Sequence, residues 1–131
     1  MNKIIFDWNC FDSPESEQKI MIFFASKSGF SDLKYFAWEC AKEEFKLEKN
    51  FLPKNYTWEE RKELYCSFQK VEEAELLKDL CVFDGLKQQT VFEIPSQILS
   101  VVKCLYSEWN YFFYAFETNH EFYSVIWSTT A

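Results

Sequence analysis

The sequence predicts a single α+β domain over residues 1–131, with three to four helices packed on a small antiparallel sheet. Hydrophobic residues make up 48% of the chain and aromatic residues 21%, which supplies one core at a length typical of one domain. Apolar residues alternate in some segments and recur at helical spacing in others, so both element types are expected. No repeat, linker or low-complexity tract divides the sequence.

The first expected element is a strand over residues 3–10, where apolar side chains alternate with Asp7 and Asn9. The segment 14–28 has two interpretations. Pro14 and Gly29 suit the start and the left-handed end of a helix, which is the structure we expect. The interior "KIMIFF" is rich in strand-forming residues and would also suit a hairpin with the first strand.

Two further helices follow in the sequence. The segment beginning at Ser31 has one apolar stripe at helical spacing, made of Leu33, Phe36, Ala37, Cys40 and Ala41. In "TWEE", Thr57 and Glu60 have the spacing of a capping box. We expect the helix that this box opens to continue to about Cys81.

The segment "PSQILSVVKCLYSEW" has features of both element types. Ile98, Val101 or Val102, Leu105 and Trp109 fall on one helical face, and we therefore expect a helix in this segment, residues 95–109. Its valine and isoleucine content would also suit a strand.

The C-terminal stretch "NYFFYAFETNHEFYSVIW", residues 110–127, contains eight aromatic residues and predicts a β-hairpin. With residues 118–121 as the loop, Glu117 faces Phe122, and the alternation of strand side chains assigns every other pair. One face collects Phe112, Tyr114, Phe116, Tyr123, Val125 and Trp127. The other collects Tyr111, Phe113, Ala115, Phe122, Ser124 and Ile126, so neither face is polar.

Three arrangements would account for a hairpin with two apolar faces. The hairpin could be central in the sheet with helices on both sides, it could pair with a second copy, or one face could dock another protein. Tyrosine and tryptophan tolerate a half-wet interface because each keeps a polar group. We therefore expect Tyr114, Tyr123 and Trp127 to contact a partner if one face is a docking surface.

The chain is acidic, with a net charge of −7 from 21 acidic and 14 basic residues. Residues 57–89 and residues 90–131 each carry a surplus of three acidic residues. Such a surface repels nucleic acids and anionic membranes and attracts basic proteins, so neither of the first two is an expected partner. The carboxylates expected to contact a basic partner are Glu59, Glu63, Glu72, Glu73, Glu117 and Glu121.

No phosphate-binding, nucleophile-elbow, zinc-protease or EF-hand motif occurs in the sequence. The five cysteines are widely spaced, and the N-terminus does not have the pattern of a secretory signal. These features predict a cytoplasmic protein with reduced, mostly buried thiols and without a metal site, a cofactor or a catalytic residue. The enzymatic alternative is a cysteine nucleophile served by His120 in the hairpin loop.

In size, acidity and aromatic content, and in the segments "TWEERKEL" and "NYFFYAFETNHEFYSVIW", the chain resembles the immunity proteins of bacterial polymorphic-toxin and contact-dependent growth inhibition systems. The resemblance implies high-affinity capping of a cognate toxin domain, often a basic nuclease, by steric and electrostatic blocking. Two alternatives are an acidic phage-type inhibitor that mimics DNA toward a host nucleic-acid enzyme, and a homodimerising structural module.

Overall fold

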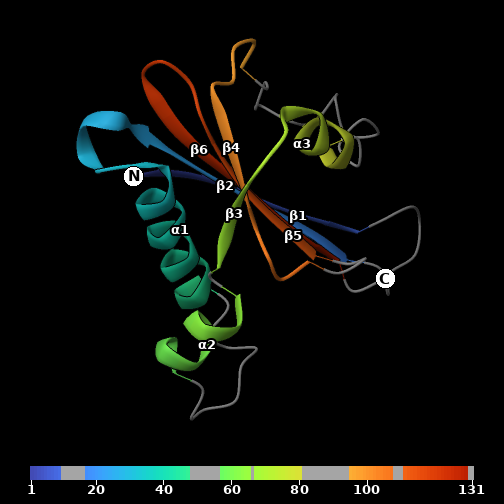
Figure 1. The fold of residues 1–131 in the computed structure, drawn as a ribbon. Coiled ribbons are helices and arrows are strands. Elements are labelled where there is room, and N and C mark those ends of the chain that lie inside the picture. Colours follow the sequence, from blue (N-terminus) through green and yellow to red (C-terminus); the bar gives the residue numbers. More distant parts are fainter. Residues whose placement is uncertain (10–16, 48–56, 66, 81–94, 108–110, 130–131) are drawn as a thin grey trace.

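A computed structural model describes residues 1–9, 17–47, 57–65, 67–80, 95–107 and 111–129 (Figure 1). In these residues six strands form one antiparallel sheet in the order β1-β2-β6-β5-β4-β3. The strands are β1 (Asn2–Asn9), β2 (Glu17–Ser26), β3 (Phe68–Val71), β4 (Ser100–Cys104), β5 (Tyr111–Glu117) and β6 (Glu121–Thr129). The helices are α1 (Leu33–Leu47), α2 (Trp58–Tyr65) and α3 (Glu73–Asp79), with a 3-10 turn, η1 (Lys27–Gly29). The predicted α+β domain is confirmed.

The aromatic hairpin forms β5 and β6, the two central strands of the sheet. Glu117 lies opposite Phe122, as predicted, and the two predicted faces follow from that register. The hairpin is therefore central, with helices on both sides of it, which is the first of the three arrangements considered. This position explains why neither of its faces is polar.

Each side of the sheet has its own hydrophobic core. We call the side covered by α1 and α2 the α1 face; its buried residues include Met21, Phe23, Phe36, Cys40, Phe113 and Ile126. We call the opposite side the α3 face; its buried residues include Ile20, Leu76, Val101, Tyr114, Phe116 and Trp127. Figure 1 shows α1 and α2 on one side of the strands and α3 on the other.

The helix expected after Ser31 is confirmed as α1. All five residues of its predicted stripe are buried against the sheet. Asp32 caps the helix, because its Oδ1 accepts the backbone N–H of Tyr35 at 2.8 Å. The sequence did not predict the burial of Glu44, which is only 5% exposed.

The helix expected over residues 14–28 is wrong. Residues 17–26 form β2, which pairs with β1 in the hairpin that was the alternative. Ile20, Met21, Ile22 and Phe23 are all buried because both faces of this strand are covered, so the segment is apolar without alternation. Gly29 closes the 3-10 turn without a left-handed backbone.

The helix expected over residues 95–109 is also wrong. Residues 100–104 form β4 between β3 and β5, and the neighbouring residues Val101 and Val102 are buried in opposite cores. Leu105 was expected on a buried helical face, but it is 57% exposed. The strand alternative was correct because a buried strand needs β-branched residues on both faces.

The long helix expected from Thr57 to about Cys81 is only partly correct. The backbone N–H of Glu60 donates to Thr57 Oγ1 at 3.3 Å, which confirms the predicted cap. However, α2 ends at Tyr65, and β3 then pairs with β4 before α3 begins.

The strand expected over residues 3–10 is confirmed over Asn2–Asn9. Four positions used in the predictions, namely Cys10, Pro14, Cys81 and Trp109, lie outside the described residues.

Candidate protein-binding surface

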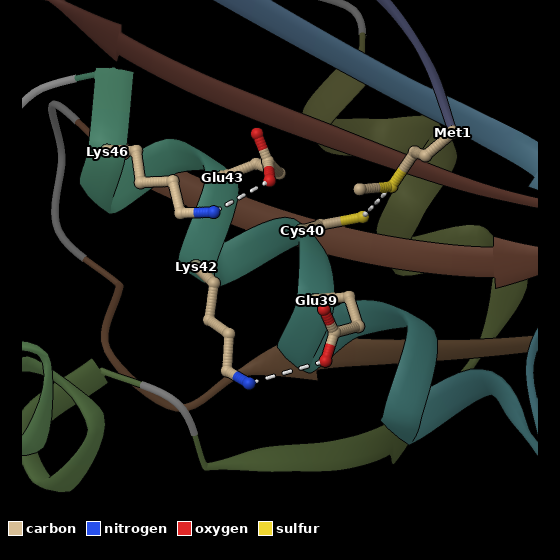
Figure 2. A network of polar contacts seen from close by, with 6 residues as sticks. All are labelled: Met1, Glu39, Cys40, Lys42, Glu43 and Lys46. Atoms are coloured by element: carbon tan, nitrogen blue, oxygen red, sulfur yellow. Dashed lines mark hydrogen bonds and ion pairs between the residues drawn. The ribbon is translucent and has the colours of Figure 1, made fainter.

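The outer surface of α1 and α2 pairs its own charges. Along α1, Lys42 lies 3.4 Å from Glu39, and Lys46 lies 3.4 Å from Glu43 (Figure 2). On α2, Lys62 lies 3.9 Å from Glu59. Each of these carboxylates has a cation one turn further along its helix, so their fields largely cancel at a distance.

The α3 face carries more carboxylates than cations. Glu72 and the helix α3 supply four of them, namely Glu72, Glu73, Glu75 and Asp79, while the nearby cations are Lys78 and Lys103. Lys103 Nζ lies 2.9 Å from Glu75 and 3.8 Å from Asp79, which neutralises that end of the group. Glu72 and Glu73 are exposed, and no cation of the described segments lies within ion-pair distance of either.

Tyr114 joins α3 to the sheet and is fully buried. Its hydroxyl donates a short hydrogen bond to Asp79, and Lys103 Nζ lies 5.2 Å from the centre of its ring. Burial raises the pKa of the Tyr114 phenol well above its ordinary value, and the Asp79 carboxylate raises that pKa further. Tyr114 therefore holds a helix in place and does not present its ring to a partner in this conformation.

Three rings form a stacked row across the α3 face. Phe24, Tyr123 and Phe116 are cross-strand neighbours on β2, β6 and β5. The ring centres of Phe24 and Tyr123 are 6.2 Å apart with planes 21° from parallel, and those of Tyr123 and Phe116 are 5.2 Å apart at 11°. Phe116 is buried, but Phe24 and Tyr123 are half-buried, so this end of the row reaches solvent.

Glu121 lies beside this row, two residues before Tyr123 on β6. Its Oε1 accepts the hydroxyl of Tyr123 at 3.2 Å. The pKa of the Tyr123 phenol is raised, first by burial and second by the neighbouring charge of Glu121. The half-buried rings of Phe24 and Tyr123 therefore lie next to two polar groups, the Glu121 carboxylate and the Tyr123 hydroxyl.

The turn that carries Glu121 is held by backbone and side-chain bonds. The Thr118 N–H donates to the Glu121 carbonyl at 3.0 Å, and the Glu121 N–H donates to Thr118 Oγ1 at 3.2 Å. The Lys27 N–H donates to the His120 carbonyl at 3.0 Å, and Lys27 Nζ lies 2.7 Å from Glu117. The position of Glu121 is therefore fixed by the fold, and the charge of Glu117 is compensated.

The structure divides the residues that the sequence predicted for partner binding. Four of them lie on the α3 face or its edge and are exposed or half-buried: Glu72, Glu73, Glu121 and Tyr123. Glu59 and Glu63 are on α2, on the other side of the sheet. Tyr114 and Trp127 are buried, at 0% and 8% exposure. Sequence reasoning missed Phe24, because its segment was expected to be helical.

The two described thiols are poorly suited to nucleophilic chemistry. Cys40 and Cys104 are buried. Cys40 Sγ lies 3.6 Å from Met1 Sδ (Figure 2). Burial raises the pKa of the Cys40 thiol well above its ordinary value of 9.0, and a thiol, unlike a thiolate, is a weak nucleophile. His120, in contrast, is exposed at the tip of the hairpin.

Two further features of the described segments bear on function. Among their residues, no three histidine, cysteine or carboxylate side chains converge to hold a metal ion. Their helices also include none that is both long enough and apolar enough to cross a membrane.

Comparison with protein-family models, with curated proteins and with solved structures finds no match for this chain.

Proposed function

We propose that this chain is an immunity protein that binds a basic toxin domain in the cytoplasm and blocks its active site. The observation that carries the proposal is the difference in charge between the two faces. On the α1 face Glu39 and Glu43 each have a lysine partner one turn away, whereas Glu72 and Glu73 on the α3 face have none among the described residues.

A net charge of −7 attracts a basic protein at long range, and an excess of carboxylates on one face orients that attraction. Nuclease active sites bind phosphates through basic side chains. The exposed carboxylates of Glu72 and Glu73 and the half-buried carboxylate of Glu121 would occupy the positions of those phosphates. The half-buried rings of Phe24 and Tyr123 would supply apolar contact area beside them.

A growth assay tests the neutralising activity. Cells that express a candidate toxin domain encoded beside this chain are grown with and without the chain. We expect the chain to restore growth. A toxin domain that kills equally in its presence, while the chain is well expressed, would contradict the proposal for that pair.

Association kinetics test the role of the α3 face. The double variant Glu72→Gln, Glu73→Gln removes two carboxylates from this face, and Glu39→Gln, Glu43→Gln removes two from α1 as a matched control. At low salt we expect the first variant to slow association with the toxin domain about three- to tenfold and to flatten its salt dependence. The control should change the rate less than about twofold. Equal slowing by both variants would show that only net charge matters.

A further inference from the structure

One end of the α3 face combines side chains that suit a single cationic group. Ser26 of β2 is the cross-strand neighbour of Glu121, and Phe24 is the neighbour of Tyr123 in the adjacent row. All four point to the same side of the sheet, because strand side chains alternate with period two. We call these four residues, Phe24, Ser26, Glu121 and Tyr123, the hairpin-end surface.

The shape of this surface follows from the sizes of its side chains. Ser26 is small and exposed, so it covers little of β2 next to the ring of Phe24. Diagonal neighbours on paired strands lie within reach of long side chains, so a side chain placed above Ser26 would reach both rings and Glu121. The Ser26 hydroxyl is itself directed to η1, where it accepts the Ser28 N–H at 3.4 Å.

The polar end of the surface offers two acceptors close together. The Glu121 carboxylate oxygen and the Tyr123 hydroxyl oxygen are 3.2 Å apart. A carboxylate has capacity for several donors, so accepting the Tyr123 hydroxyl leaves further positions on Glu121 for a partner. Two adjacent acceptors suit the planar, multiply donating guanidinium better than the single ammonium of lysine.

We propose that the hairpin-end surface receives an arginine side chain of the basic partner, with its guanidinium on Glu121 and Tyr123 and its methylene stem against Phe24. The inference rests on the proposed function for the nature of the partner. The stem of an arginine covers apolar surface while its head group stays at the polar end. The α3 face, with its excess of carboxylates, supplies the charge complementarity for such a partner.

The turn makes the arrangement rigid before binding. Glu121 is fixed by the reciprocal bonds with Thr118, and η1 is joined to the same turn through Lys27. Little conformational freedom is lost when a partner side chain binds such a surface.

The test is an NMR titration of the full chain with a short peptide of alternating glycine and arginine, and with its lysine counterpart. The expected result is that the arginine peptide shifts the amides of Phe24, Ser26 and Glu121 and binds several-fold more tightly than the lysine peptide. Absence of shifts at these amides at millimolar peptide would overturn the proposal.

Two isosteric variants separate this site from general charge attraction. Glu121→Gln should weaken binding of the arginine peptide about tenfold. Glu117→Gln removes the same charge from the same turn on the opposite face and should weaken it less than about twofold. Equal losses in the two variants would overturn the assignment.

Tyr123→Phe keeps the ring and removes one acceptor, so it should reduce the preference for arginine over lysine. A preference unchanged in this variant would overturn the role of the hydroxyl. These outcomes are distinct from those of the proposed function. Suppose that Glu121→Gln does not weaken binding of the arginine peptide, while the Glu72 and Glu73 variant still slows association with the toxin domain. The arginine site is then excluded and the proposed function stands.

Discussion

The two faces of the sheet hold their helices with the same kind of bond but leave different surfaces to solvent. On the α1 face Tyr111 donates to Glu44 at 2.9 Å, and on the α3 face Tyr114 donates to Asp79. Both tyrosines come from the central strand β5. Glu44 is 5% exposed, whereas the Asp79 side chain is 33% exposed and also lies near Lys103.

This difference indicates a division of roles between the faces. The 15-residue α1 buries a continuous stripe and pairs the charges on its outer side, so its contribution is stability. The seven-residue α3 buries Leu76 and keeps its carboxylates near water. A short helix whose acids are near water contributes less to the core and more to the electric field at the protein surface.

The largest expected effects come from replacing one large buried side chain in each core by alanine. Phe36 and Leu76 are both fully buried, one on each face. Phe36→Ala should lower the free energy of unfolding by about 3–5 kcal/mol, and Leu76→Ala by about 2–5 kcal/mol, with the phenylalanine change the larger because it removes more apolar area. Urea unfolding measures both changes.

The control for these variants is Tyr35→Ala, since Tyr35 is on α1 beside Phe36 but is 50% exposed. Its cost should stay below about 1 kcal/mol. A greater loss at Leu76 than at Phe36 would reverse the assignment of α1 as the main stabilising layer.

An intermediate effect is expected from removing each tyrosine hydroxyl. Tyr111→Phe deprives the buried Glu44 carboxylate of a donor and should cost about 2 kcal/mol. Tyr114→Phe should cost about 1 kcal/mol, because Asp79 keeps Lys103 and access to water. Thermal or urea unfolding compares the pair. A larger cost at Tyr114 would mean that the α3 face depends more on its polar contact than its exposure suggests.

A further effect, absent at neutral pH, is a loss of stability at high pH. The pKa of Tyr114 is raised above its ordinary value of 10.0, so above about pH 10 the unfolded chain loses this proton while the folded chain keeps it. The unfolded state then binds fewer protons, and stability falls as pH rises, by at most about 1.4 kcal/mol per pH unit for this group.

Urea unfolding between pH 9 and pH 12 measures this slope. The variant Tyr114→Phe should have a shallower slope, while the buried thiol of Cys40, whose pKa is also raised, continues to contribute. An identical slope in the variant would exclude Tyr114 as a source of the alkaline loss.

The hairpin was the part of the fold that the sequence predicted best. Once residues 118–121 are taken as the loop, period-two alternation fixes every pair, and the observed register has Glu117 opposite Phe122. The α1 stripe was also predictable, because one helical face is apolar and the rest is charged.

The wrong secondary-structure predictions all concern strands of the sheet that were expected to be helices, namely β2, β3 and β4. β2 and β4 are buried on both faces, so their apolar runs lack alternation and resemble buried helix. In residues 57–81, Phe68 and Val71 fit helical spacing, but pairing with β4 makes them a strand. Long-range pairing outweighed local pattern in each case.

The candidate site could be predicted only in part. The carboxylates of Glu72, Glu73 and Glu121 can be read from the sequence. Whether a cation lies within ion-pair distance of each one depends on the fold. Tyr114 and Asp79 are 35 residues apart, and no local spacing connects them. The sequence therefore supplied residues of the proposed surface without showing that Tyr114 would be buried beneath α3.

The strand order has a consequence for how the protein is made. β1 and β2 can pair soon after they leave the ribosome, and β3 and β4 can pair once β4 has emerged, but these two strand pairs are joined only through β5 and β6. The two central strands are the last of the six to be synthesised. Until they emerge, the nascent chain has two incomplete sheets with exposed edges, so most of the folding must follow their synthesis.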